Sequence, residues 1–385
     1  MGRVVVAQKY TPQVQAELSE MHEHYRQLLD RGDRWSLRAL FSTEDCDIAE
    51  YCRDFAPNRF GEQACAQVED FCREHGIWLE HGGAHYNSMT PYLHPRATTV
   101  ERMVTIGIYN AILFWLNDTV GREKFGHLSA AEQAQALYEV DRLCRLFEAE
   151  DIPPLPEAEG TPPAPSPPGP IETATTEFLS MLADQADPAW LRSFRILTVD
   201  HLRPAIRDQN ASARRDLLGV DDYIALRNEI SGMYPAIALC DFARGVVLPW
   251  DRIRAVGLDE DVRVLIRLTA EIGALMNDVF SFEKECIVDR SDFNLVPILL
   301  LNTPGATLSD AVTGAADVVR DRLTHFRTLR ARVLRRCADV ADAELSEAVA
   351  EYLADLDQCV QASWVWQCVS PRYKGTSIFV EDHLA

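Results

Sequence analysis

The sequence predicts an all-α protein. Apolar residues recur at i, i+3 and i+4 through most of the 385 residues, a spacing that gathers them on one face of a helix. The alternation of apolar and polar residues that is typical of strands is almost absent. A hydrophobic content of 47% is sufficient for a large core. Length alone allows two or three domains, so the number of domains depends on where the functional residues lie.

The periodicity predicts about eleven helices. In chain order they cover residues 12–31, 61–75, 100–116, 130–148, 171–184, 188–210, 220–226, 231–244, 259–285, 307–337 and 342–369. A break is expected between Gly232 and Pro235, because Pro235 lacks a backbone donor and a run of this composition disfavours an unbroken helix. Pro371 is expected to end the last helix, since the residue before a proline is driven away from α geometry.

One segment interrupts the helical pattern. Nine prolines lie between Ile152 and Pro170, so this stretch is expected to be extended or disordered. Such a stretch can be an interdomain linker, or it can be a long loop inserted between two helices of one domain. The choice depends on whether functional residues on its two sides belong to one site.

Composition excludes several classes of partner. The net charge of −21 argues against nucleic acid and against an anionic membrane surface, because both require a basic face. We find no apolar run of 18 residues and no basic leader followed by an apolar segment, which favours a cytoplasmic protein without an integral membrane segment. The ten cysteines show neither a CxxC pair nor zinc spacing, so buried reduced thiols are expected. A homodimer is left open.

The most informative stretch is a polar strip on the predicted helix over residues 259–285. Asn277, Ser281 and Glu285 are spaced four residues apart, which stacks an amide oxygen, a hydroxyl and a carboxylate on one helix face. Mg²⁺ accepts such oxygens and keeps other positions for water or phosphate oxygens, so the strip indicates a metal site that serves a phosphorylated ligand. Lys284 adds a positive charge for that ligand. The alternative is a solvated polar face, which the apolar residues around the strip disfavour.

Two further segments carry groups that suit phosphate. Arg227 lies five residues before Gly232, and its guanidinium fork suits bidentate recognition of phosphate. Arg372 and Tyr373 follow Pro371 on a predicted loop, where both side chains can donate hydrogen bonds to phosphate oxygens and the loop can close as a lid. Taken singly, each of these residues is more often a surface residue. Their order along the chain favours the functional interpretation.

Together these segments resemble class I terpene synthases of the bacterial and fungal type with a single α domain. In that family Asn, then Ser or Thr, then Glu recur at four-residue steps with a basic residue before the Glu, as in the strip from Asn277 to Glu285. A diphosphate-sensing Arg followed five residues later by a Gly at a helix break matches Arg227 and Gly232. An Arg-Tyr pair that closes over the diphosphate matches Arg372 and Tyr373.

The resemblance covers about residues 100–373 and implies the class I terpenoid synthase fold, an α-helical bundle with a central active-site cavity. It implies that residues 1–385 form one domain, because one metal motif precedes the proline-rich segment and the other follows it. That segment, about residues 152–170, is then an inserted loop. The resemblance also implies an isoprenyl diphosphate as substrate and three Mg²⁺ ions as cofactors, with Mn²⁺ as an alternative metal.

The first metal motif departs from the family pattern. Where the family has two adjacent Asp and a third acid three or four residues on, this chain has Asn117, Asp118 and Gly121. Asn117 can still offer a neutral oxygen to a metal, although the loss of a carboxylate weakens the attraction for a divalent ion. We expect Asp118 to be the main ligand and Glu123 to be a supplementary one.

The chemistry that the resemblance implies also needs aromatic side chains. A ring face attracts a nearby carbocation by about 0.5–2 kcal/mol without acting as a nucleophile. Candidates lie on the helices that carry the motifs, although each is as often a core residue. They are Tyr109, Phe114, Trp115, Phe280, Trp364 and Trp366.

The expected function is that of a class I terpene cyclase. The enzyme would ionise an isoprenyl diphosphate with Mg²⁺, cyclise the cation, end the reaction by deprotonation or water capture, and release pyrophosphate. A twenty-carbon substrate such as geranylgeranyl diphosphate is favoured over fifteen-carbon farnesyl diphosphate, because the chain is longer than a minimal cyclase, although the proline-rich segment accounts for part of the excess.

Two alternatives from other classes stay open. A chain-elongating isoprenyl diphosphate synthase shares the α-helical architecture, but it needs a second complete aspartate-rich motif, and Asn277–Glu285 is not one. The other alternative is a catalytically inactive helical homologue that acts as a binding protein, which the replacements at Asn117 and Gly121 motivate. Magnesium-dependent release of pyrophosphate would separate the enzymes from the inactive homologue.

Overall fold

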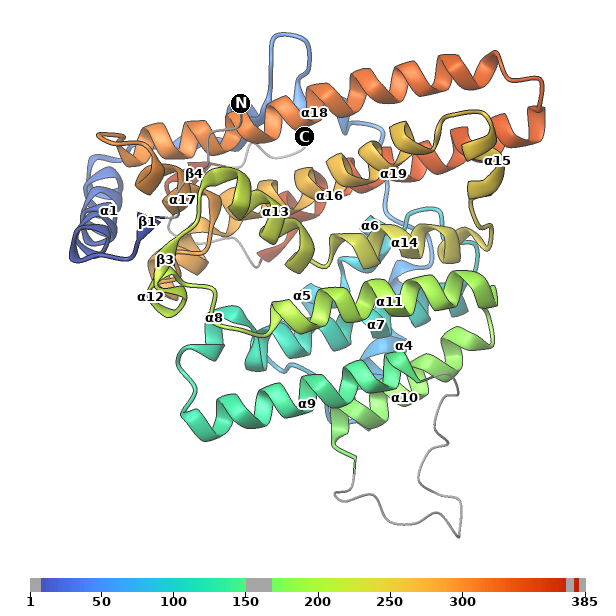
Figure 1. Cartoon of the computed structure of the whole chain (residues 1–385), viewed down its shortest axis with the longest axis horizontal. Helices are drawn as coiled ribbons and strands as arrows, with labels where there is room; N and C mark the ends of the chain where they lie inside the picture. The colour runs from blue at the N-terminus through green and yellow to red at the C-terminus, as the bar shows by residue number, and fades with distance from the viewer. Residues whose placement is uncertain (1–7, 150–167, 372–376, 381–385) are drawn as a thin grey trace.

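The computed structural model describes residues 8–149, 168–371 and 377–380, and its architecture is all-α, as predicted (Figure 1). All eleven predicted helices are present within these residues. Their bounds are α1 Pro12–Arg31, α4 Gly61–Glu74, α7 Val100–Val120, α9 Ala130–Glu148, α10 Pro170–Ala183, α11 Pro188–Ala205, α13 Val220–Ile230, α14 Met233–Arg244, α16 Asp259–Phe282, α18 Leu308–Ala338 and α19 Ala343–Val369.

The described residues contain further short elements that periodicity did not predict, because one or two turns are too short to show a helical period. The helices are α2 Leu37–Phe41, α3 Ile48–Tyr51, α5 Gly83–Asn87, α6 Thr90–Leu93, α8 Arg122–Phe125, α12 Ala211–Arg214, α15 Trp250–Ala255, the π-helix η1 Glu283–Val288 and α17 Leu295–Asn302. Strand β1 Gln8–Lys9 pairs antiparallel with β3 Asp216–Leu217, and β2 Trp35–Ser36 pairs parallel with β4 Phe379–Val380.

Four predicted boundaries are wrong by more than two residues. Helix α7 continues beyond residue 116 to Val120, so Asn117 and Asp118 lie inside a helix. Helix α11 ends at Ala205 rather than at residue 210, one residue after Pro204, which cannot donate to the helix. Helix α13 continues beyond residue 226 to Ile230, so Arg227 lies inside a helix. The helix predicted over 259–285 changes at Phe282 from α to π geometry.

The predicted break between α13 and α14 is present. Gly232 has a φ of 78°, in the left-handed region that glycine adopts without a steric penalty, and α14 begins at the next residue. The last long helix, α19, ends at Val369, two residues before Pro371, as expected. Both features place the end of a helix or a turn beside the residues of the candidate site.

Two hydrophobic cores hold the bundle together. One joins α16, α18 and α19 with α1 and α17, and the other joins α4, α7, α9, α10 and α11 (Figure 1). Helices α13 and α14 lie between them, since α14 contacts α7 and α11 on one side and α16 and α19 on the other. The candidate site lies along this junction.

The state of the cysteines agrees with the prediction. All ten lie in the described part of the chain as free thiols, and each is buried except Cys65, which is half-buried. Among the described residues, no helix combines the length and apolar character that a membrane span requires.

Candidate active site

A cavity lies where the two cores meet. Side chains from α6, α7, α11, α13, α14, α16 and α19 form its wall, most of them apolar. Its volume is about 200 Å³, more than ten times the ~10–15 Å³ that one water molecule needs, so it has room for an organic ligand. Helix α7 precedes residues 150–167 and helices α13 and α16 follow them, so both parts of the chain contribute to one cavity.

The polar strip of α16 reaches this cavity. Asn277 and Glu285 line the wall, and Ser281 is buried on the turn between them. Glu285 lies in the π-helix η1, whose wider turns rotate it away from the position that a continuous α-helix would give. The predicted placement of the side chains on one helix face therefore applies to Asn277 and Ser281. The π-helix determines where the Glu285 side chain points.

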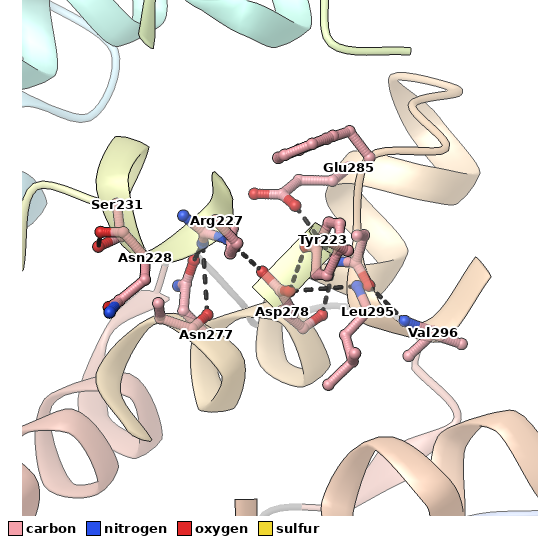
Figure 2. Close-up of polar contacts among 12 residues, drawn as sticks. Tyr223, Arg227, Asn228, Ser231, Asn277, Asp278, Glu285, Leu295 and Val296 are labelled. Atoms are coloured by element: carbon pink, nitrogen blue, oxygen red, sulfur yellow. Dashed lines mark hydrogen bonds and ion pairs between the residues drawn. The ribbon is translucent and has the colours of Figure 1, made fainter. Parts of the chain in front are cut away.

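Arg227 is held against the strip by a buried hydrogen-bond network (Figure 2). Its Nε donates to Asp278 Oδ1 at 2.8 Å, and its Nη2 donates to Asn277 Oδ1 at 3.1 Å. Although burial lowers the pKa of the Arg227 guanidinium, the Asp278 carboxylate raises that pKa above its ordinary value, so Arg227 is a permanent cation. Arg227 lines the cavity, and among the described residues no hydrogen bond engages its Nη1, so the guanidinium keeps donors that can bind an anion.

Asp278 is a residue that the sequence analysis missed. Its fully buried carboxylate accepts hydrogen bonds from Arg227, from the Tyr223 hydroxyl and from the backbone N–H of Leu295, at 3.1 Å for the last (Figure 2). Tyr223 and Arg227 are four residues apart on α13, so one helix face presents both donors. The available signal was an acidic residue inside the mainly apolar second half of α16, which must find a buried partner.

Glu285 has a positioning partner that the sequence analysis also missed. Asn294 Nδ2 donates to Glu285 Oε2 at 3.2 Å and to the Asp278 carbonyl oxygen at 2.8 Å. The same Asn294 caps α17 by accepting from the Val296 N–H at 3.0 Å. Asn277 is likewise fixed, because its Nδ2 donates to Gln367 Oε1 of α19 at 2.9 Å. The ligand oxygens are therefore oriented by contacts from three other elements.

The strip fits a hard cation. Ser281 Oγ is buried and, in the part of the chain that the structure describes, no hydrogen-bond partner lies within its reach. A bound cation would satisfy such a hydroxyl, and the buried Glu285 carboxylate would supply charge. Within the described residues no three His, Cys, Asp or Glu side chains gather around one metal position. A metal here would depend on Asn and Ser oxygens and on phosphate oxygens of a ligand.

The first motif lies in the last turn of α7. Asn117 lines the cavity and donates to Asp118 Oδ1 at 3.0 Å, while Asp118 also accepts from the Tyr86 hydroxyl. The last carbonyl groups of a helix form its negative end, which favours a nearby cation. At Gly121 a Cβ atom would approach the Asn117 carbonyl oxygen to 2.3 Å, so this backbone cannot carry an acid at that position without shifting.

Lys284 does not belong to the cavity wall in the described residues. Its ammonium pairs with Asp289 at 3.6 Å, and Asp289 also pairs with Lys124 of α8 at 3.4 Å. Asp289 thus links the segment after the first motif to the segment after the second one. Binding of a ligand by Lys284 would require it to leave Asp289.

Two of the six aromatic candidates line the cavity, Phe114 and Trp366. Phe114 stacks on Tyr86 with ring centroids 4.6 Å apart, and Trp366 Nε1 donates to Ser88 Oγ at 3.1 Å. The prediction is wrong for the other four because each faces a core. Tyr109 packs against α10 and α11, Trp115 packs on the core around α7, and Phe280 and Trp364 pack against each other with centroids 5.7 Å apart.

Three predicted site residues are not placed by the structure. Arg372 and Tyr373 lie outside the described residues, as does the proline-rich segment apart from its last residues. Glu123 belongs to α8, but its side chain is outside the described part. Their roles stay predictions.

Comparison with known proteins identifies one family. Residues 109–325 match the model described as terpene synthase family 2, C-terminal metal binding. The match includes α7 from Tyr109 onward, the Arg227 network and the whole polar strip of α16 and η1.

Individual relatives agree with this match. The chain is 26% identical over 205 residues to Sesquiterpene synthase 1 of Postia placenta, covering 52% of this chain and 56% of the relative. It is 28% identical over 211 residues to a (−)-β-caryophyllene synthase of Saccharothrix espanaensis, described as (2E,6E)-farnesyl diphosphate cyclizing, covering 53% and 57%. The chain thus matches little more than half the length of these curated relatives.

The fold has close counterparts among solved structures. The structure of an α-eudesmol synthase superposes with a TM-score of 0.66 at 19% sequence identity, covering 82% of this chain and 97% of that one. This likeness assigns the class I terpenoid synthase fold.

Proposed function

The chain belongs to the class I terpene synthase family, and on that premise we propose that it ionises an isoprenyl diphosphate in a metal-dependent step and cyclises the resulting cation. The observation that carries the proposal is one cavity whose wall is mainly apolar and which also contains Arg227, Asn277 and Glu285. A ligand with a hydrocarbon chain and a charged head group matches both parts.

The metal would be Mg²⁺, three ions by analogy with the family, with Mn²⁺ as an alternative. Asn277, Ser281 and Glu285 would hold one ion, and Asp118 with Asn117 and Glu123 would hold the others. When bound, such ions polarise the phosphate oxygens of the leaving group. Arg227, fixed by Asp278, would bind the diphosphate directly, and we propose that Lys284, Arg372 and Tyr373 join it.

The chain's own residues then protect the cation. The apolar wall keeps water away from the hydrocarbon, and the rings of Phe114 and Trp366 offer faces that attract positive charge without forming a bond to it. Because Arg227 and Asn277 are held by neighbouring contacts before the ligand arrives, these two side chains need little reorganisation at the moment of ionisation.

The favoured substrate is fifteen-carbon farnesyl diphosphate. The names of the relatives lean toward sesquiterpene synthases and include one described as farnesyl diphosphate cyclizing, so they give no support to the twenty-carbon preference. That preference rested on chain length, to which the proline-rich segment contributes.

The remaining expectations are proposals of the same kind. Because α7 and α16 line one cavity, we propose that residues 1–385 form one domain with an inserted loop at about residues 152–170. The cytoplasmic location and the homodimer stay predictions.

The test is incubation of the purified protein with ten-, fifteen- and twenty-carbon allylic diphosphates, with Mg²⁺ or with excess chelator. We expect pyrophosphate release and cyclic terpenes that require the metal, with the fifteen-carbon substrate turned over best. Chain extension on addition of isopentenyl diphosphate would indicate the elongating alternative. A folded protein that releases no pyrophosphate from any of these substrates would indicate the inactive homologue.

A further inference from the structure

The apolar part of the cavity ends at a defined layer. On α16 the wall residues are Asn277 and, about one turn earlier, Ala274 and Gly273. On α14 the wall ends at Ala236, and on α19 it ends at Ala362. Among the described residues, the next turn of each of the last two helices does not line the cavity, and there the thiols of Cys240 and Cys359 contact each other at an Sγ–Sγ distance of 3.6 Å.

Leu93, the last residue of α6, closes this end. It forms a small apolar cluster with Ala236 and Ala362, separate from the two large cores. Leu93 lines the cavity and also lines a second, much smaller hollow beyond it. Its backbone carbonyl accepts from Cys359 Sγ at 3.6 Å, which holds this residue against α19. Leu93 is therefore the partition between the two spaces.

The two sides of the partition differ in chemistry. The smaller hollow has a volume of about 10 Å³, close to the space that one water molecule needs. Its wall includes His94 and the buried ion pair of Arg244 with Asp355. The cavity side at this level is apolar: the methyl groups of Ala236 and Ala362 lie beside Leu93, and Met89, which packs against this cluster, also lines the cavity. A hydrocarbon chain that extended past Leu93 would have to displace polar contacts.

Side-chain size then decides the depth of the cavity. Ala236 and Ala362 project one carbon each, so Leu93 is the bulky member of the three buried residues of the layer, and of these three it is the one that also lines the smaller hollow. We propose that Leu93 is the residue that limits the isoprenyl chain of the substrate to fifteen carbons. This inference rests on the proposed function and names the feature that selects the substrate. Truncation to Ala removes three carbons of the five that separate a fifteen-carbon from a twenty-carbon chain.

The experiment compares kcat/KM for ten-, fifteen- and twenty-carbon diphosphates, measured by pyrophosphate release, in the wild type, Leu93→Ala and Ala236→Leu. One methylene in an apolar pocket changes selectivity by about 10- to 200-fold. We expect Leu93→Ala to raise the ratio of twenty- to fifteen-carbon kcat/KM at least tenfold. Ala236→Leu, which adds three carbons to the same layer, should raise the ratio of ten- to fifteen-carbon kcat/KM by a similar factor.

Leu301→Ala is the matched control. Leu301 and Leu93 are both 6% exposed, but Leu301 lies on α17, away from the described cavity wall. The control should lose stability as Leu93→Ala does and leave both ratios unchanged. Circular dichroism and a melting curve establish that each variant is folded.

The outcomes separate the two proposals. Unchanged ratios in a folded Leu93→Ala variant of an active wild type would overturn the role of Leu93 alone. If Leu93→Ala does not fold, an unchanged ratio in Ala236→Leu leads to the same conclusion. No pyrophosphate release by the wild type from any substrate would overturn the proposed function and this inference with it.

Discussion

The two ends of the cavity at which we propose metal binding are built differently. At the α16 end, Asn277 and Glu285 are fixed by Arg227, Gln367 and Asn294, and the network is buried. At the α7 end, the half-buried Asp118 is the one carboxylate of the described motif, held by Asn117 and by the Tyr86 hydroxyl.

This difference explains how the site can contain a first metal motif that lacks carboxylates of the family pattern. A buried hydrogen-bond network positions the Asn277 and Glu285 side chains before binding and supplies the permanent cation Arg227. The α7 end lies at the negative end of a helix, so it then needs to supply one carboxylate rather than a complete cluster of carboxylates. We infer that the α16 end determines whether ionisation occurs, and that the α7 end adjusts how much metal is required.

Glu285→Gln has the largest expected effect and tests the role of the α16 end. Loss of the metal ligand should lower pyrophosphate release by at least about 10⁴-fold, or about 5.5 kcal/mol in the barrier, while circular dichroism shows unchanged helix content. Glu260→Gln, an exposed residue in the first turn of α16, is the control and should keep wild-type activity. Activity near that of the wild type in Glu285→Gln would show that this strip does not bind the metal.

Asp278→Asn tests whether the network is preorganised by charge. The change keeps the side-chain shape and leaves the buried Arg227 guanidinium without its counter-ion, so the free energy of unfolding should fall by about 3–5 kcal/mol in urea titrations. The same change at Asp251, which pairs with Arg254 on the surface, should cost less than about 1 kcal/mol. Equal losses in the two variants would mean that the buried pair has no special role.

Asp118→Asn measures how much the α7 end contributes to activity. Because Asp118 is the main anionic ligand expected there, the variant should lose on the order of 10²-fold in kcat/KM at fixed Mg²⁺, whereas Glu123→Gln should stay within about twofold of the wild type. Magnesium titrations of both variants check this order. If Asp118→Asn leaves kcat/KM unchanged, the first motif lies elsewhere.

Asn117→Asp tests the α7 end in the opposite direction, because it adds a carboxylate there. Asn117 lines the cavity, so a carboxylate there restores the charge that the family pattern has. Activity should be kept, and the Mg²⁺ concentration for half-maximal activity should fall by roughly threefold to tenfold, about 1 kcal/mol. A higher magnesium requirement in this variant would show that the α7 end is not limited by charge.

Much of this arrangement could be predicted from the sequence because it is local. Helical periodicity located all eleven long helices, and several bounds agree to the residue, as in α1 and α9. The four-residue spacing of Asn277 and Ser281 placed both on one face, and the Gly232 to Pro235 run placed the break between α13 and α14. Each of these inferences needs only residues within a few turns of one another.

Tertiary structure decided the rest, because it depends on which helix faces meet. Periodicity marks Tyr109, Phe114, Phe280 and Trp366 alike as apolar helix residues, and only packing turns Phe114 and Trp366 toward the cavity. The pairing of Asp278 with Arg227 joins two helices through residues that are 51 positions apart in sequence. The layer at Leu93 brings together α6, α14 and α19, so no local pattern could reveal where the cavity ends. The sequence by itself determined which side chains could take part, and the contacts between distant helices determined which of them share the cavity.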